Sequence, residues 1–286
     1  MEGHGQRNAS TGRNPVTMPE LPEVESIRRK LNTILPDQRI LEYKSLDLKT
    51  CRFSENDFAQ IKKRNFQTFR RWGKHLIGCF ENCPAALHIH LGMTGFAGVT
   101  RSIPQTDFLR LFFTLNKGYL YLDDMRKFGF IEIQDLAGLK QKVLAGLGPD
   151  ALMGEIDACE LYLRAQKLRR PVHSVLLDQR FLAGIGNIYA AEILFDSRVN
   201  PFKHVSFLSI EEWWRIINSM HKILSDAVSF NGSTFVHHPA RTMDERFRKE
   251  FLQVYGREGE PCPRCRASLV RTKSQRSIYF CPSCQE

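Results

Sequence analysis

Four cysteines near the C-terminus constrain the fold of this chain more than any other sequence feature. They form two Cys-x2-Cys pairs that stand 15 residues apart: Cys262 and Cys265, then Cys281 and Cys284. Two such pairs can place four thiolates at the corners of a tetrahedron, which is the geometry of a structural zinc site. Four protein ligands leave no position open for catalysis. The spacing therefore predicts one structural zinc ion in a small finger, in preference to redox pairs or free thiols.

The segment between the cysteine pairs is basic throughout. No acidic residue stands between Cys262 and Cys284, and this stretch carries Arg264, Arg266, Arg271, Lys273 and Arg276. Residues 269–280 (LVRTKSQRSIYF) read as two short strands around a polar turn. Such a hairpin is either a solvated tip or a finger that lies on phosphates, and its uniform charge favours the second interpretation.

Charge and cysteine usage narrow the class of protein further. Lysine and arginine number 41 against 31 acidic residues, which gives a formal charge of +10 and a pI near 9.3. This balance favours a polyanionic partner, either nucleic acid or an anionic membrane. The chain contains neither a long apolar run nor a basic amphipathic helix, so we expect no membrane association. The other four cysteines are dispersed, which argues against a secreted disulfide scaffold.

The periodicity of apolar residues predicts three parts. From Pro22 a helical stripe begins, with a proline in its first turn. Residues 39–135 then contain short β-type runs separated by Gly, Pro and Asn, and residues 155–230 change to helical spacing. The expected fold is thus an α+β multidomain protein with a leading helix, a β-sandwich, a helical domain and the finger.

The domain limits that follow from this organisation are 18–145, 146–233 and 234–286. Residues 1–17 lack the apolar stretch of a secretory signal, and we interpret them as a disordered tail or a misplaced start.

Two further motifs have alternative explanations. The sequence GIGN at 184–187 could begin a dinucleotide-binding loop, but Tyr189 stands where the third glycine of that motif belongs. His88 and His90 alternate along a predicted strand, and the sequence offers no third ligand for a metal site there. We therefore assign neither a nucleotide cofactor nor a second metal.

Six motifs in consistent order identify a family resemblance that spans Met18 to Glu286. They are MPELPEVE at 18–25, RWGKHL around Lys74, HLGMTG at 90–95, DMRKFG at 124–129, GIGNIYA at 184–190, and QVYGREGEPCPRC running on to QRSIYFC. This set resembles the formamidopyrimidine-DNA glycosylase and endonuclease VIII family. The resemblance implies a catalytic β-sandwich, a helix-two-turn-helix DNA-binding domain and a zinc finger.

The resemblance assigns catalytic roles to four residues. It makes Pro19 an amine nucleophile that forms a Schiff base at the sugar C1′, once Met18 is removed. Glu20 matches the carboxylate that transfers a proton during opening of the sugar ring. Lys74 matches a lysine of phosphate contact and elimination, and Arg276 matches an arginine that grips the phosphates beside the lesion.

The resemblance also implies how the DNA is held while a damaged base is flipped out of the stack. Phe128 would wedge between base pairs, Met93 would fill the vacated space, and Arg126 would hydrogen-bond the orphaned base. This trio is similar to that of the oxidised-purine branch. The remaining DNA-contact positions implied by the family are Glu23, His90 and Asn187, with amides near Asn187 holding phosphates.

The function that the resemblance implies is base-excision repair. The protein would remove oxidised purines such as 8-oxoguanine and formamidopyrimidines from double-stranded DNA and then cleave the strand as an apurinic/apyrimidinic lyase. We expect a monomer in a bacterial cytoplasm, associated with the nucleoid through DNA binding. The alternative is a non-catalytic protein that binds damaged DNA or abasic sites, because residues 1–18 would make the nitrogen of Pro19 an amide. A zinc-ribbon transcription factor is a third reading, but it would have no use for PELPEVE.

Two segments depart from the family pattern. Thr106, Asp107 and Phe108 replace a His-x-His contact to DNA, and VHHPARTMDERFRKEF at 236–251 replaces a glycine-containing loop that caps the lesion. The preferred lesion is therefore open at this point.

Overall fold

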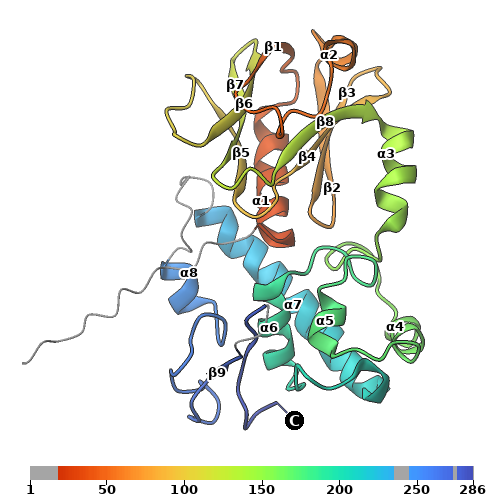
Figure 1. Cartoon of the computed structure of the whole chain (residues 1–286), viewed down its shortest axis with the longest axis vertical. Helices are drawn as coiled ribbons and strands as arrows, with labels where there is room; N and C mark the ends of the chain where they lie inside the picture. The colour runs from red at the N-terminus through yellow and green to blue at the C-terminus, as the bar shows by residue number, and fades with distance from the viewer. Residues whose placement is uncertain (1–18, 235–244, 273–275, 286) are drawn as a thin grey trace, which may run out of the picture.

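The computed structural model describes residues 19–234, 245–272 and 276–285. The expected tail at 1–17, Lys273 and most of the predicted lesion loop lie outside the described residues. The described part has two lobes, one built from strands around a central helix and the other from helices with the finger beside them (Figure 1). The predicted α+β organisation is confirmed.

The first lobe is a sandwich of two antiparallel four-stranded sheets with the orders β1-β6-β7-β5 and β2-β3-β4-β8. The strands are β1 (Ile40–Ser45), β2 (Phe66–Trp72), β3 (His75–Phe80), β4 (Ala85–His90), β5 (Gly95–Thr100), β6 (Leu109–Leu115), β7 (Gly118–Asp124) and β8 (Phe130–Asp135). In β6 the side chains of Leu111 and Phe113 are fully buried, whereas Arg110 is only half-buried. This alternation places one face of the strand against the core.

Helix α1 (Leu21–Ile34) joins the two lobes. Its residues Val24, Ile27 and Leu31 belong to the sandwich core, whereas Leu21 at its first turn packs in the core of the helical lobe. The helix contacts β2 and β5 on one side and α7 on the other. The apolar stripe predicted from the sequence therefore carries the N-terminal end of the helix, and Glu20 before it, to the junction between the lobes.

Two short helices complete the sandwich lobe, α2 (Glu55–Ile61) and α3 (Leu136–Lys142), and a 3-10 turn follows at Leu144–Gly146. The helical lobe contains α4 (Ala158–Ala165), α5 (Val172–Leu176), α6 (Asn187–Asp196), a 3-10 turn at Val205–Phe207, and the long α7 (Ile210–Thr234). Helix α6 is buried along almost its whole length, and it packs against α5 and α7. None of the helices within the described ranges is long and apolar enough to cross a bilayer.

The C-terminal part begins with α8 (Glu245–Glu250) and contains the strand pair β9 (Val270–Arg271) and β10 (Tyr279–Phe280). The predicted hairpin is present, although each strand is only two residues long. Its small core consists of Cys262, Cys281 and Leu269 packed on Phe195 of α6. The finger therefore rests on the same helix whose first turn reaches the lobe junction.

Candidate active site and metal centre

The carboxylate of Glu20 lies in a cradle of backbone amides at the start of α6. Its Oε2 accepts hydrogen bonds from the N–H of Gly186 at 2.8 Å and of Tyr189 at 3.3 Å, and its Oε1 accepts from Ile188 at 2.9 Å. The side chain is fully buried. These amides are the unsatisfied donors of a helix N-terminus, where the helix dipole also favours negative charge.

This cradle limits which backbone amides near Asn187 are available to DNA, and the phosphate contact of Asn187 itself stays a prediction. The resemblance implied that amides near Asn187 hold DNA phosphates, but Glu20 occupies those of Gly186, Ile188 and Tyr189. The approach is possible because residue 186 has no side chain. A Cβ atom there would stand 2.2 Å from Cδ of Glu20 and 2.4 Å from its Oε1. The glycine of GIGN therefore makes room for a carboxylate of the protein itself.

A second buried carboxylate supports the first. Glu23 Oε2 accepts a hydrogen bond from the backbone N–H of Glu20 at 2.9 Å, and its Oε1 accepts from the Tyr189 hydroxyl at 2.6 Å. Glu23 is only 3% exposed, and its bond to the N–H of Glu20 fixes the backbone beside Pro19. The DNA contact that the family resemblance implied for Glu23 stays a prediction.

Lys74 projects from the turn between β2 and β3. Gly73 before it has φ +53°, a left-handed conformation that favours glycine. It lies against Ala183 and Gly184, which belong to the loop that precedes α6. The turn therefore brings Lys74 of the sandwich lobe close to the loop that leads to the Glu20 cradle.

The three ionisable groups at this junction shift one another's protonation. Burial raises the pKa of Glu20 above its ordinary value, while the charge of Lys74 and the cradle amides oppose the rise. Burial raises the pKa of Glu23 to about 7, against the hydrogen bond from Tyr189. Burial also lowers the pKa of Lys74, and the two carboxylates oppose that change. Two buried carboxyl groups and a buried amine, each with a shifted pKa, therefore lie at one junction, as is common in acid-base active sites.

Pro19 lies directly before Glu20 and is buried. Its placement therefore brings the predicted nucleophile, the predicted proton donor and Lys74 to one junction. Arg276 also lies near this junction, because its charge contributes to lowering the pKa of Lys74. The side-chain Nδ2 of Asn187 donates to the carbonyl of Ser277 at 3.0 Å, which ties the basic hairpin to the start of α6.

The three residues expected to fill the DNA void lie on two neighbouring turns of the sandwich lobe. Arg126 and Phe128 are exposed, with the guanidinium 5.0 Å from the ring centre, and Met93 is half-exposed. The turns touch, since a Cβ on Gly92 would stand 2.5 Å from the carbonyl carbon of Phe128. Asp124 fixes the second turn by accepting from the N–H groups of residues 126 and 129. The structure thus brings the trio together.

His90 presents one ring nitrogen as a donor. Its Nδ1 accepts a hydrogen bond from the N–H of Gly92 at 3.1 Å, and burial lowers its pKa to about 4. The neutral ring therefore carries its proton on Nε2, which suits a single hydrogen bond to a phosphate oxygen. The sequence did not indicate a row of hydrogen bonds beside His90. In it the ring of His75 hydrogen-bonds that of His88 at 2.9 Å, and His88 hydrogen-bonds the carboxylate of Glu132 at 2.6 Å.

The four predicted zinc ligands converge. Their sulfur atoms all lie within 4.8 Å of one another, with Cys262 and Cys284 3.8 Å apart and Cys265 and Cys281 3.5 Å apart. Zn–S bonds of about 2.3 Å in a tetrahedron require sulfurs about 3.8 Å apart, so the donor set fits a zinc ion. This is the only such cluster of metal-ligating side chains in the described part of the chain. Four thiolates close the site, and the zinc is structural.

We expect Cys281→Ser to lose the zinc and to weaken DNA binding by at least about tenfold, because metal ligation supplies most of the folding free energy of so small a finger. Metal analysis should fall from one zinc per chain to none, and fluorescence anisotropy would measure the binding. Cys159→Ser, which changes an exposed cysteine on α4, is the control. Full affinity in a zinc-free Cys281→Ser protein would contradict this prediction.

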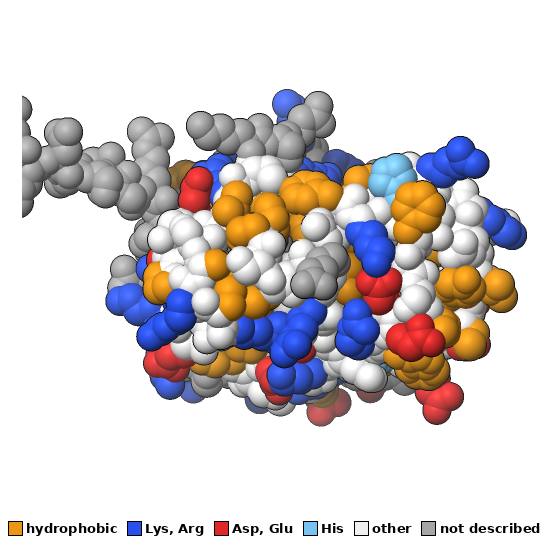
Figure 2. Space-filling view, turned by 90° about the horizontal axis from the view of Figure 1, so that it is seen from below, with side chains coloured by type: hydrophobic (Ala, Val, Ile, Leu, Met, Phe, Trp, Pro, Cys, Tyr) orange, Lys and Arg blue, Asp and Glu red, His pale blue; other side chains and the backbone are white. Residues whose placement is uncertain are grey.

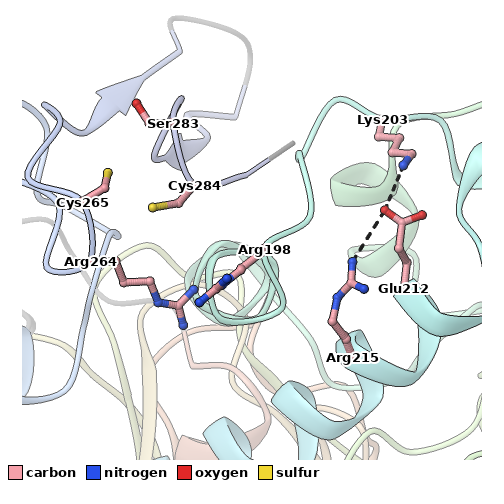
Figure 3. Close-up of a pocket in the computed structure, with 8 residues that line it drawn as sticks. All are labelled: Arg198, Lys203, Glu212, Arg215, Arg264, Cys265, Ser283 and Cys284. Atoms are coloured by element: carbon pink, nitrogen blue, oxygen red, sulfur yellow. Dashed lines mark hydrogen bonds and ion pairs between the residues drawn. The ribbon is translucent and has the colours of Figure 1, made fainter.

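A recess of about 670 Å³ lies elsewhere, between the finger and the helical lobe. Its lining includes Arg198, Arg264 and an ion-paired group in which Glu212 contacts Lys203 and Arg215 (Figure 3). Arg264 donates to the carbonyls that end α6, whereas Glu20 lies at the start of that helix, about 15 Å away. The recess is therefore separate from the candidate active site.

Basic and acidic side chains are interspersed on the face of the molecule that is seen from below. Seen from below, lysine and arginine side chains stand between hydrophobic patches and acidic ones, without forming a single stripe (Figure 2).

Comparison with known proteins agrees with this organisation. Three family models match in order: the formamidopyrimidine-DNA glycosylase N-terminal domain at residues 18–131, its H2TH domain at 147–238, and a zinc finger found in FPG and IleRS at 259–286. A sandwich domain, a helix-two-turn-helix domain and a four-cysteine zinc finger in this order define a class of base-excision DNA glycosylases. The chain belongs to the formamidopyrimidine-DNA glycosylase family.

Individual relatives cover nearly the whole chain. The formamidopyrimidine-DNA glycosylases of Chloroflexus aurantiacus and Desulfitobacterium hafniense are each 35% identical over 94% of this chain and 98% and 100% of their own lengths. A crystal structure of the Lactococcus lactis enzyme bound to DNA with an abasic site has a TM-score of 0.84 and 28% identity, and covers 94% of this chain and 100% of its own. Another, with an N7-benzyl-Fapy-dG DNA, has a TM-score of 0.85.

Proposed function

We propose that this protein is a bifunctional DNA glycosylase and apurinic/apyrimidinic lyase of base-excision repair that acts on oxidised purines in double-stranded DNA. The observation that carries the proposal is the buried Glu20 carboxylate, held by three amides beside Pro19 and electrostatically linked to Lys74. Family membership and the relatives' damaged-DNA complexes support the substrate class. Domain limits at 18–145, 146–233 and 234–286 are part of the proposal.

The first chemical step uses Pro19 and Glu20. The lone pair of a free Pro19 amine attacks the sugar C1′, and the glycosidic bond breaks with its electrons going to the base. The proton that the Pro19 nitrogen then loses neutralises the departing base. Glu20 transfers a proton to the sugar ring oxygen, which opens the ring and leaves an iminium ion on C1′. Burial raises the pKa of Glu20, which favours the protonated form that this step needs, and the cradle keeps its oxygens in place.

The second step is strand cleavage. The iminium ion makes the C2′ proton acidic, and that proton passes to solvent water. The electrons of the C2′–H bond form a C2′–C3′ double bond, and the C3′–O bond breaks to release the 3′ phosphate with its bonding electrons. Lys74 and Arg276 supply positive charge for the phosphates, and His90 offers a neutral N–H donor. Met93, Arg126 and Phe128 stand ready on adjoining turns to occupy the space of the flipped base.

The proposal includes the oligomeric state of the protein and its location in the cell. One chain carries all the residues assigned to the site, which supports a monomer. The bacterial origin of the relatives supports action at the nucleoid of a bacterial cytoplasm.

The second candidate function is silent binding to damaged DNA or abasic sites. The observation in its favour is that Met18 precedes Pro19 in the sequence, since an acylated proline nitrogen has no nucleophilic lone pair. The two functions differ in covalent chemistry and not in DNA affinity.

Glu20→Gln tests the glycosylase assignment. We expect excision of 8-oxoguanine from a duplex to fall by about 10³-fold, because the amide cannot transfer the proton. Binding to a duplex with a stable abasic analogue should change only a few-fold. Single-turnover assays and anisotropy measure the two quantities.

Glu192→Gln is the matched control. Glu192, on α6, is a buried carboxylate like Glu20. It accepts hydrogen bonds from the N–H groups of Gln253, Val254 and Tyr255, which lie just before the finger. It should lose similar stability but keep its excision rate once DNA is bound. Wild-type excision by Glu20→Gln would refute the proton-transfer role.

A further inference from the structure

We infer that Asp150 is a positioning residue, which holds the turn carrying Lys74 against the loop that forms the Glu20 cradle. This inference rests on the proposed function for its catalytic consequence. The carboxylate lies in the segment that connects the two lobes, after α3 and before α4. Its contacts run in both directions from there.

The first set of contacts fixes the Lys74 turn. Asp150 Oδ2 accepts from the N–H of Gly73 at 2.7 Å and from Arg71 Nη1 at 2.6 Å, and its Oδ1 accepts from Arg71 Nη2 at 3.0 Å. Arg71 Nη1 also donates to the carbonyl of Gly73 at 3.0 Å. Asp150 therefore holds the N–H of Gly73 and Arg71 holds its carbonyl, and the two side chains form a bidentate ion pair with each other.

The ion pair is itself anchored. The Arg71 side chain is 0% exposed, and its Nε donates to Glu25 of α1 at 3.1 Å. Glu25 stays ionised, because Arg28, Arg29 and Arg71 hold its pKa at about 2 against the effect of burial. A buried guanidinium between two carboxylates has its geometry set by three elements of the fold, and the loss of either carboxylate leaves charge uncompensated.

The second set of contacts ties Asp150 to the cradle loop. The N–H of Ala151 donates to the carbonyl of Ala183 at 3.0 Å, and the N–H of Ala183 donates to the carbonyl of Pro149 at 2.9 Å. The next residue, Gly184, accepts from the N–H of Leu21 at 3.1 Å. The backbone around Asp150 thus pairs with the loop that leads to Gly186 and Glu20.

Together these contacts make Asp150 a common support. Its side chain sets the Lys74 turn and its backbone sets the loop of the Glu20 amides, so the separation of the two catalytic side chains depends on it. Displacement of a reacting group by about 1 Å can cost about 10²-fold in rate, which is the scale on which such support acts.

The test is Asp150→Asn in a chain that begins at Pro19, with two readouts. For cleavage of a preformed abasic site, kcat should fall by about tenfold or more while KM for the DNA changes less than about threefold. Amide hydrogen exchange at residues 72–75 should accelerate by at least about tenfold, whether or not the protein is active. Arg71→Lys combined with Asp150→Asn should be little worse than either variant alone, because both break one unit.

Asp178→Asn is the control. Asp178 also accepts from two arginines, Arg170 and Arg180, in the helical lobe, and it does not contact the Lys74 turn. It should leave both readouts unchanged. Unchanged exchange at 72–75 in Asp150→Asn overturns the inference, as does faster exchange with wild-type kcat. A wild-type chain without any cleavage activity would instead refute the proposed function, and the exchange measurement would still decide whether Asp150 holds the turn.

Discussion

A chain that begins at Pro19 is expected to become covalently attached to abasic DNA on treatment with borohydride, whereas a chain in which Met18 precedes Pro19 is not. Borohydride reduces an imine to a stable amine, and an imine at the sugar C1′ requires a free amine on the protein. The tertiary structure supports this difference because Pro19 adjoins Glu20 at the lobe junction. Denaturing electrophoresis of labelled DNA measures the trapped complex directly.

The control for this experiment is Pro19→Gly in the shortened chain. A glycine at the N-terminus retains a primary amine, so some trapping should persist, and both chains should bind the DNA. Efficient trapping by a chain shown by mass to retain Met18 would sink the assignment and would point to a lysine, with Lys74 the first candidate. Trapping by neither chain, with binding intact, would favour the silent binding protein.

Replacement of Gly186 by alanine is expected to abolish excision almost as completely as removal of the Glu20 carboxyl, with a loss of about 10³-fold. The backbone itself tolerates alanine, since φ at residue 186 is −124°. The added methyl group would stand 2.2 Å from the Glu20 carboxyl carbon, which leaves the carboxylate no position in the cradle. Each buried amide left without a partner also costs about 1–3 kcal/mol of stability.

Single-turnover excision and thermal unfolding would together measure this effect. Gly146→Ala is the matched control, because a Cβ there meets no atom within 4 Å. It should leave both the rate and the melting temperature close to those of the wild type. Wild-type excision by Gly186→Ala would show that the cradle is dispensable.

The sequence determined those features whose parts lie close together along the chain. Two Cys-x2-Cys pairs predicted the zinc ligands, because metal geometry restricts the spacing within each pair, and the fold brings all four sulfurs together. Apolar periodicity predicted α1 and the change from strands to helices, since both follow local repeats. The motifs around Pro19, Lys74 and Arg276 indicated the family, and their individual roles stay predictions.

Tertiary structure decided what those motifs do to one another. No local pattern indicates that Glu20 takes the amides of residues 186–189, which lie more than 160 positions further along the chain. No local pattern indicates that Arg71 pairs with Asp150, or that the buried carboxylate of Glu192 accepts from the N–H of Val254. The only sequence signal for Glu192 was an acid within an apolar helix, and Asp150 gave none.

The physical reason lies in how the two kinds of information arise. Helix periodicity and metal-ligand spacing depend on neighbouring residues, so they can be read before the chain folds. The cradle and the Arg71–Asp150 pair exist only when α1, α6, the β2–β3 turn and the lobe connector meet. Burial at that meeting point removes water from Glu20, Glu23 and Lys74, and the resulting pKa shifts belong to the assembled junction and to no segment of the sequence.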